Sequence, residues 1–220
     1  MGSFINLTAE GCLIIQQYDT PVDLREAARG KTFERLHVYG RPSSLDHISE
    51  LTHLVELKLQ STGHLDFACL KDYTRLQELN CFSGSLRAID LAFAKKTLKK
   101  LSIGRHKALI DVSPIAVCSR LEVLELSHLP NIERHVSLSA FSRLKELQLI
   151  NLRTWPGVEG LAKTPRLETL SLGRTKIADG DWSPLLRLKR LNFVGGLRDA
   201  FGPAAAAEFR KKRPDVEAVD

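Results

Sequence analysis

The sequence repeats one short apolar pattern at nearly constant intervals. Apolar residues occupy the first, fourth and sixth positions of eight segments, in steps of 21, 22, 22, 23, 23, 23 and 21 residues. The segments begin at Phe33, Leu54, Leu76, Leu98, Leu121, Leu144, Leu167 and Leu188. Because an internal period of this length is typical of repeat architectures, the pattern predicts a stack of equivalent units.

Each segment is expected to be a short strand. Its fourth and sixth residues lie two apart and therefore point to the same face of a strand. One such strand cannot bury its apolar face alone, whereas eight parallel strands stacked in chain order bury a continuous core. The rest of each unit of 21 to 23 residues must return behind the sheet, which favours short turns and 3₁₀ segments over long helices.

Two of the return segments share a corner motif, Asp-x-Ser-Pro, at residues 111–114 and 181–184. The Asp or Ser side chain can accept hydrogen bonds from nearby backbone amides and start a turn. The proline fixes the backbone dihedral that the first turn of a short helix needs. The motif therefore predicts the same corner in both units.

These features resemble the leucine-rich repeat superfamily, whose signature begins L-x-x-L-x-L, over residues 33 to about 195. The Asp-x-Ser-Pro corners are similar to those of its short-repeat bacterial, internalin-like class. The resemblance implies an α/β solenoid, a leucine-rich repeat horseshoe with parallel strands on the concave face and short turns or 3₁₀ segments on the convex side. The ninth position, where the family usually carries asparagine, instead holds Thr62, Gly84, His106, Leu129, Leu152 and Thr175.

A solenoid needs covered ends, and the chain is expected to divide into three parts. Residues 1–32 predict an N-terminal cap, formed by a hairpin and a short helix with Thr20 as N-cap, Pro21 at its first position and Gly30 as its stop. Residues 33–195 form the eight repeats. Residues 196–220 predict a C-terminal helical cap and tail, because a proline precedes four alanines.

Composition places the chain among ordinary globular proteins, with 43% hydrophobic and 26% charged residues. The N-terminus has neither a basic leader nor a long apolar run, which predicts a cytoplasmic protein without membrane contact. Four cysteines, Cys12, Cys69, Cys81 and Cys118, form no C-x-x-C pair. They are expected to be single buried thiols and not zinc ligands or disulfides.

The formal charge of +6 collects in two basic clusters, at residues 95–100 and 210–213. A nucleic-acid or ribonucleoprotein binder is therefore an alternative hypothesis. Neither cluster is interleaved with aromatic residues that could stack on bases, so solvated edges of a protein that does not bind nucleic acid are the favoured interpretation.

The sequence carries no motif for catalysis. It contains no G-x-S-x-G, H-E-x-x-H, G-x-x-x-x-G-K or G-x-G-x-x-G segment. The seven histidines are scattered, and only His37 is expected at an outward strand position. No catalytic residue, metal site or cofactor is predicted, and a binding role is favoured over an enzyme.

The repeat supplies a large ordered surface instead, because the third, fifth and seventh positions of each unit point away from the core. The predicted partner-binding residues on this concave face are Arg35, His37, Tyr39, Glu56, Lys58, Gln60, Glu78, Asn80, Phe82, Glu125, Glu146, Gln148 and Ile150. In the last unit the same rule places Arg190, Asn192 and Val194 on this face.

The composition of this face favours a protein partner. Tyr39 and Phe82, with Ile150, are apolar where a solvated strand would carry polar residues, and an aromatic pair ringed by polar groups is typical of a binding hot spot. The alternative is that the N-terminal cap or loops cover them. The four glutamates of the face suggest that the partner presents Lys or Arg.

The sequence thus predicts a non-enzymatic protein-interaction module that is monomeric on its own. An inhibitor or immunity-type protein that occludes its partner and the recognition domain of a secreted effector are both compatible with this prediction.

Overall fold

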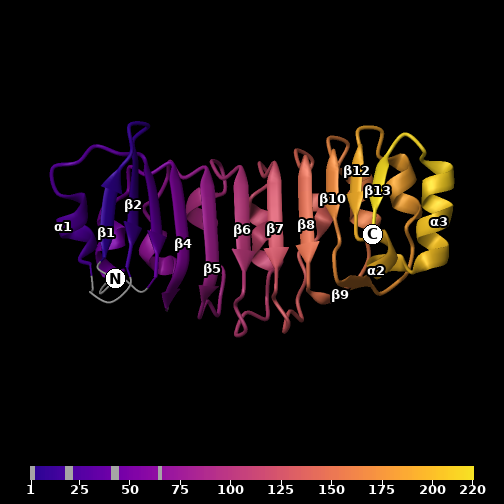
Figure 1. Ribbon diagram of the computed structural model, residues 1–220, viewed down its shortest axis with the longest axis horizontal. Coiled ribbons are helices and arrows are strands. Elements are labelled where there is room, and N and C mark those ends of the chain that lie inside the picture. Colours follow the sequence, from indigo (N-terminus) through magenta and orange to yellow (C-terminus); the bar gives the residue numbers. More distant parts are fainter. Residues whose placement is uncertain (1–2, 18–21, 41–44, 64–65) are drawn as a thin grey trace.

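The computed structural model describes residues 3–17, 22–40, 45–63 and 66–220. Within these ranges, eleven strands form one open sheet that runs the length of the molecule in chain order, with helix α1 at one end and helices α2 and α3 at the other (Figure 1). The strands are β1 Phe4–Leu7, β2 Cys12–Gln16, β3 Arg35–Tyr39, β4 Glu56–Gly63, β5 Glu78–Gly84, β6 Lys100–Gly104, β7 Val123–Ser127, β8 Glu146–Ile150, β10 Thr169–Ser171, β12 Phe193–Gly195 and β13 Glu217–Val219. The predicted solenoid of parallel strands is confirmed.

The repeats are stacked in exact register. The fourth position of each unit pairs with the fourth position of the next, and these leucines form one fully buried column. Its members are Leu36, Leu57, Leu79, Leu101, Leu124, Leu147 and Leu170. Because a shift of one residue would turn every such leucine out of the core, burial of this column fixes the register.

The return segments behind the sheet are short 3₁₀ helices, as expected. They are Asp46–Glu50, Phe67–Leu70, Ala92–Ala94, Ser113–Val117, Leu138–Ala140, Glu159–Lys163 and Ser183–Arg187. A second, two-stranded parallel sheet joins β9 Arg153–Trp155 to β11 Thr175–Ile177.

The predicted Asp-x-Ser-Pro corner is confirmed in both places. The carboxylates of Asp111 and Asp181 each accept a hydrogen bond from the amide of the serine two residues later, at 2.8 Å. The following proline lies in the first turn of a 3₁₀ helix. Asp66 and Asp90 make the same carboxylate-to-amide bond at 2.9 and 3.0 Å without a following Ser-Pro, so the carboxylate is the shared element of the corner.

At the N-terminal end, β1 and β2 form an antiparallel hairpin, and β2 also pairs in parallel with β3. The hairpin thereby contributes a strand of its own to the stack. Helix α1 (Leu24–Ala28) has Asp23 as N-cap, whose carboxylate accepts from the Arg25 amide at 2.8 Å. It begins later than predicted from Thr20 and Pro21, which lie outside the described residues.

The register predicted for the last repeat is wrong by three residues. Phe193 pairs with Thr169 and Val194 with Leu170, so the unit begins at Leu191 and not at Leu188. Leu188 instead occupies the interior position that Thr164 fills one repeat earlier, because each donates its amide to the carbonyl three residues before it. An apolar residue at that interior position produced a false L-x-x-L match.

This shift changes the concave face in the last unit. Val194 is fully buried and not outward, and Phe193 takes the third position of the unit. Arg190 and Asn192 precede strand β12 and lie outside the three outward columns.

The C-terminal end is built from α2 (Leu197–Phe201), α3 (Pro203–Lys212) and β13. Strand β13 pairs in parallel with β12 and extends the sheet by one more strand, whereas the sequence indicated only a helix and a tail here. Phe209 of α3 is fully buried and packs edge-on against Trp182, with ring centroids 5.9 Å apart. The helix therefore covers the core at this end of the solenoid.

Candidate protein-binding face

The thirteen residues predicted for partner binding all lie on strands β3, β4, β5, β7 and β8, in the third, fifth and seventh columns of the concave face. Gln60 is exposed and the other twelve are half-buried. The parallel register places equivalent positions of neighbouring strands side by side, so the columns run across the strands.

A hollow of about 470 Å³ lies in this face. It brings Tyr39, Phe82 and Ile150 to one place, although they come from strands β3, β5 and β8. Four more predicted residues line it: Lys58, Gln60, Asn80 and Glu125. The three apolar side chains are half-buried, so each still presents part of its surface to the hollow.

Gly104 creates the space that Phe82 fills. These residues are register partners on β5 and β6, and Ser127 is the partner of Gly104 on β7. A Cβ atom at residue 104 would lie 2.4 Å from the Phe82 ring and 2.6 Å from the Ser127 hydroxyl oxygen. The phenyl ring therefore leans over the glycine, and the absence of a side chain there sets the floor of the hollow.

The N-terminal half of the face carries a chain of alternating charges. Glu56 accepts a hydrogen bond from His37 at 2.6 Å and pairs with Lys58 at 2.8 Å. Lys58 also reaches Glu78 at 3.2 Å, and Glu78 lies 3.4 Å from Lys100. Glu56 and Glu78 are thus already neutralised by basic neighbours.

The titration of this network follows its geometry. Burial opposes ionisation of Glu56, but hydrogen bonds from Lys58 and His37 outweigh it and lower the pKa of Glu56. Burial likewise disfavours the charged form of Lys58, and the two neighbouring glutamates nevertheless raise its pKa. Both groups therefore stay charged near neutral pH.

Glu125 and Glu146, in the other half of the face, have no such basic partner. Glu125 accepts from the Ser127 hydroxyl at 3.2 Å, and Glu146 accepts from the Gln148 amide at 2.5 Å. Within the described residues, no Lys, Arg or His lies within 4.0 Å of either carboxylate. The acidic character expected for the whole face is confined to this pair.

Two residues at the ninth position, His106 and Thr175, form hydrogen bonds between neighbouring turns in place of the asparagine. Nδ1 of His106 accepts from the Leu86 amide at 3.3 Å, and Nε2 donates to the Cys81 carbonyl at 3.1 Å. The Thr175 hydroxyl accepts from the Leu152 amide at 3.2 Å. His106 lies in the loop after β6 and is nevertheless buried, at 2% exposure. Burial lowers the pKa of His106.

Sequence reasoning missed the eighth position of the first seven units, which lies at or near the carboxyl end of the concave strand. The backbone there is left-handed, with φ between 53° and 61°. This column consists of Ser61, Ser83, Arg105, His128, Asn151 and Arg174, and Gly40 holds the same place with φ of 91°. Ser83, Arg105 and His128 line the hollow from this column. Only Gly40 and Asn151 indicated the left-handed conformation in the sequence, because glycine and asparagine tolerate it.

The two basic clusters are largely engaged within the fold. The Arg213 side chain is 12% exposed and donates to the carbonyls of three leucines at 3.2 to 3.3 Å. Arg210 and Lys212 pair with acidic neighbours at 2.7 and 2.8 Å. Lys99 donates to a glutamine at 2.8 Å, and Lys100 belongs to the charge chain described above. These contacts engage five of the eight basic side chains of the two clusters.

Within the described residues, the four cysteines form no disulfide. Cys12, Cys81 and Cys118 are buried, as expected, and Cys69 is half-buried. Burial raises the pKa of Cys118 to about 12. Among the residues that the structure describes, no group of three or more His, Cys, Asp or Glu side chains is placed to hold a metal ion. No helix in the same ranges has the length and apolar character needed to cross a membrane.

Comparisons with known proteins find similarity in structure alone. No protein-family model matches the chain, and no curated protein matches it in sequence. An internalin (inlF) from Listeria monocytogenes has 22% identity and a TM-score of 0.64, over 87% of this chain and 62% of the internalin. A leucine-rich-repeat protein of Leptospira interrogans has 20% identity and a TM-score of 0.63, over 86% of this chain and 47% of that protein.

A third similar structure is a chain of the mouse RP105/MD-1 complex, with 16% identity and a TM-score of 0.64, over 96% of this chain and 38% of that one. The chain spans about three fifths of the internalin's length and less than half of the other two. With the stacked parallel strands and 3₁₀ returns, these neighbours show that the chain has the leucine-rich-repeat fold.

Proposed function

We propose that this chain is a protein-interaction module that binds a protein partner on its concave face and does no chemistry on it. The observation that carries the proposal is the hollow that gathers Tyr39, Phe82 and Ile150 on a rigid sheet. Half-buried aromatic groups ringed by polar and charged side chains have the composition of an interface hot spot. Eight repeat strands at about 4.8 Å spacing give a face roughly 35 Å long, which suits a protein better than a small substrate.

The charges of the face suggest the chemistry of the partner. Glu56 and Glu78 are neutralised within the chain, so they offer little attraction to an incoming cation. Glu125, which lines the hollow, and Glu146 have no basic partner among the described residues. We therefore expect the partner to place an apolar side chain in the hollow and a Lys or Arg against these two carboxylates.

The biological role proposed is that of a cytoplasmic, monomeric inhibitor or immunity-type protein that occludes a surface of its partner. A long, ordered face suits occlusion because it covers a large area without rearranging. A similar chain occurs in the mouse RP105/MD-1 complex, which supports binding in general. A recognition domain of a secreted effector would use the same face, and its partner would then come from a host cell.

An affinity capture from the native host tests the proposal. The wild-type chain should retain a specific protein that the Tyr39→Ala/Phe82→Ala variant loses, because the variant removes both aromatic walls of the hollow. The control is Ile110→Ala/Val117→Ala, which removes two apolar side chains that are 48% and 47% exposed outside the concave face. Circular dichroism checks that all three proteins are folded. An unchanged partner in the Tyr39/Phe82 variant would refute the proposed site.

A further inference from the structure

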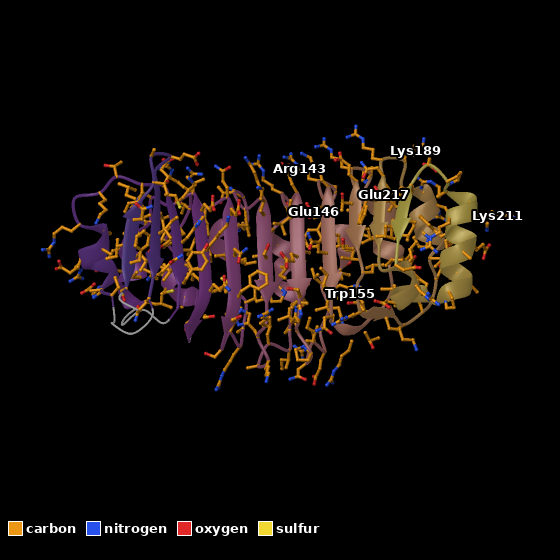
Figure 2. All side chains as sticks on the ribbon, in the orientation of Figure 1. Arg143, Glu146, Trp155, Lys189, Lys211 and Glu217 are labelled. Atoms are coloured by element: carbon orange, nitrogen blue, oxygen red, sulfur yellow. The ribbon has the colours of Figure 1, made fainter. Side chains whose placement is uncertain are left out.

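The turns after strands β6, β7 and β8 carry a basic surface that the sequence-based prediction did not include. A hollow of about 370 Å³ is lined there by Arg105, Lys107, His128, Pro130, Asn151 and Arg153. We call these six residues the basic ledge. In Figure 2, nitrogen-tipped side chains gather below the lower ends of these strands. No carboxylate lines the ledge.

The charges of the basic ledge are not neutralised by the chain itself. Arg105, Lys107 and Arg153 are exposed, and within the ranges that the structure describes none of them forms an ion pair. Basic side chains elsewhere along the sheet are paired, such as Arg35 with Glu10 and Lys145 with Glu122. The ledge is therefore a local excess of positive charge that can attract a counter-charge from outside.

The backbone of the ledge is left-handed at three of its residues. Arg105, His128 and Arg153 have φ angles of 61°, 55° and 62°. A left-handed conformation costs residues other than glycine and asparagine about 1 kcal/mol or more. Asn151 and Gly40 show that the same turn accepts the two residue types without that cost. Ser61, Ser83 and Arg174 share this conformation outside the ledge, so the left-handed backbone sets the direction of these side chains and the unpaired charges distinguish the ledge.

The ledge is continuous with the proposed binding face. Arg105 and His128 line both the ledge and the hollow that contains Phe82. A partner segment that leaves the hollow at this edge therefore passes directly over the free guanidinium groups. This continuity favours the same partner as the source of the counter-charge.

We propose that the basic ledge binds an acidic, extended segment of the protein partner whose apolar anchor occupies the concave hollow. The inference rests on the proposed function and adds a second contact to it. Carboxylates suit this surface because an arginine guanidinium binds them with two parallel hydrogen bonds. No Phe, Tyr or Trp lines the ledge, so it lacks the stacking platforms on which single-stranded nucleic acid binders rely.

The test uses a fluorescent ten-residue glutamate peptide titrated onto the purified chain at low salt and followed by anisotropy. The variant Arg105→Asn/Arg153→Asn removes two ledge charges at left-handed positions that asparagine tolerates, so its melting temperature should equal or exceed that of the wild type. Its peptide affinity should fall by about tenfold or more. The matched control Lys95→Asn/Lys96→Asn removes two exposed lysines that precede β6, and its affinity should stay within about twofold of the wild type.

Two further arms separate the possible causes. The Tyr39→Ala/Phe82→Ala variant should bind the glutamate peptide as the wild type does, because this probe has no apolar anchor. Partner capture therefore tests the proposed function at the hollow, and peptide binding tests the ledge separately. A ten-nucleotide deoxythymidine strand should bind more weakly than the peptide. Tighter binding of the oligonucleotide, no saturable binding of the peptide, or an equal loss in the Lys95/Lys96 control would each overturn the proposal.

Discussion

Single residues replace the asparagine that the leucine-rich-repeat signature places at the ninth position. His106 joins two turns because it accepts from the Leu86 amide and donates to the Cys81 carbonyl. This arrangement requires the neutral imidazole with its proton on Nε2, since a charged ring has no acceptor for the amide. A buried histidine in this place makes the stability of the solenoid sensitive to pH.

The sign of that sensitivity follows from the lowered pKa of His106 in the fold. Below about pH 6.5 the unfolded chain binds a proton at this residue that the folded chain resists. The contribution of neutral His106 is therefore complete above that pH and is lost as the pH falls. His106→Ala should lower the free energy of unfolding by about 2 kcal/mol at pH 8, because it leaves a buried amide and carbonyl unpaired.

The same variant should also lose less stability than the wild type between about pH 7 and pH 5, because the titrating group is gone. Urea denaturation at several pH values measures both effects. A pH dependence identical to that of the wild type would show that His106 does not carry the effect; His135, whose pKa burial also lowers, would then be the group to substitute next.

Gly104 is the second residue on which a larger feature depends. Gly104→Ala should force the Phe82 ring out of its position, lower the free energy of unfolding by about 1 to 3 kcal/mol and weaken partner capture. Gly173 provides a matched control in the same column, because a Cβ there would meet no atom within 4 Å. Gly173→Ala should leave stability unchanged or raise it by up to about 1 kcal/mol. Equal melting temperatures for the two variants would contradict the packing described for Phe82.

At the scale of elements, the sequence predicted the repeat strands better than the last repeat and the caps. Seven of the eight repeats have the register expected from their leucines, because burial of one alternating face tolerates no shift. The last repeat was misplaced because the residue three before the first position of the motif is buried in the core in five of the eight units. That place holds Tyr73, Cys118, Phe141, Thr164 or Leu188, and only the last of these imitates the leucine pattern.

The caps were less predictable because they depend on contacts that are distant in the sequence. Strand β13 contains only one half-buried residue and two exposed ones, so no apolar pattern marks it. It pairs with β12. The Arg213 side chain donates hydrogen bonds to three leucine carbonyls and thereby holds the turn that precedes the strand. The three columns of the concave face followed from the repeat, but the hollow did not, since part of its wall comes from left-handed turn residues.

At the scale of the whole molecule, the solenoid is a one-dimensional stack in which each turn packs on its neighbours. The effect of a substitution on packing should therefore extend to the adjacent turns and not along the length of the solenoid. Ile15 and Ile103 test this expectation because both are fully buried in the sixth-position column, on β2 and β6. Four strand spacings, roughly 19 Å, separate them.

Ile15→Val and Ile103→Val should each lower the free energy of unfolding by about 1 kcal/mol, and the double variant should lose the sum within about 0.5 kcal/mol. Leu126 is the register partner of Ile103, so Leu126→Ala combined with Ile103→Val should deviate from the sum by more than that, because the two side chains share one packing environment. Urea denaturation of the single and double variants gives both coupling energies. A coupling between the distant pair as large as that between the neighbours would mean that strain travels along the stack, and the hollow and the basic ledge could then no longer be altered independently of the ends.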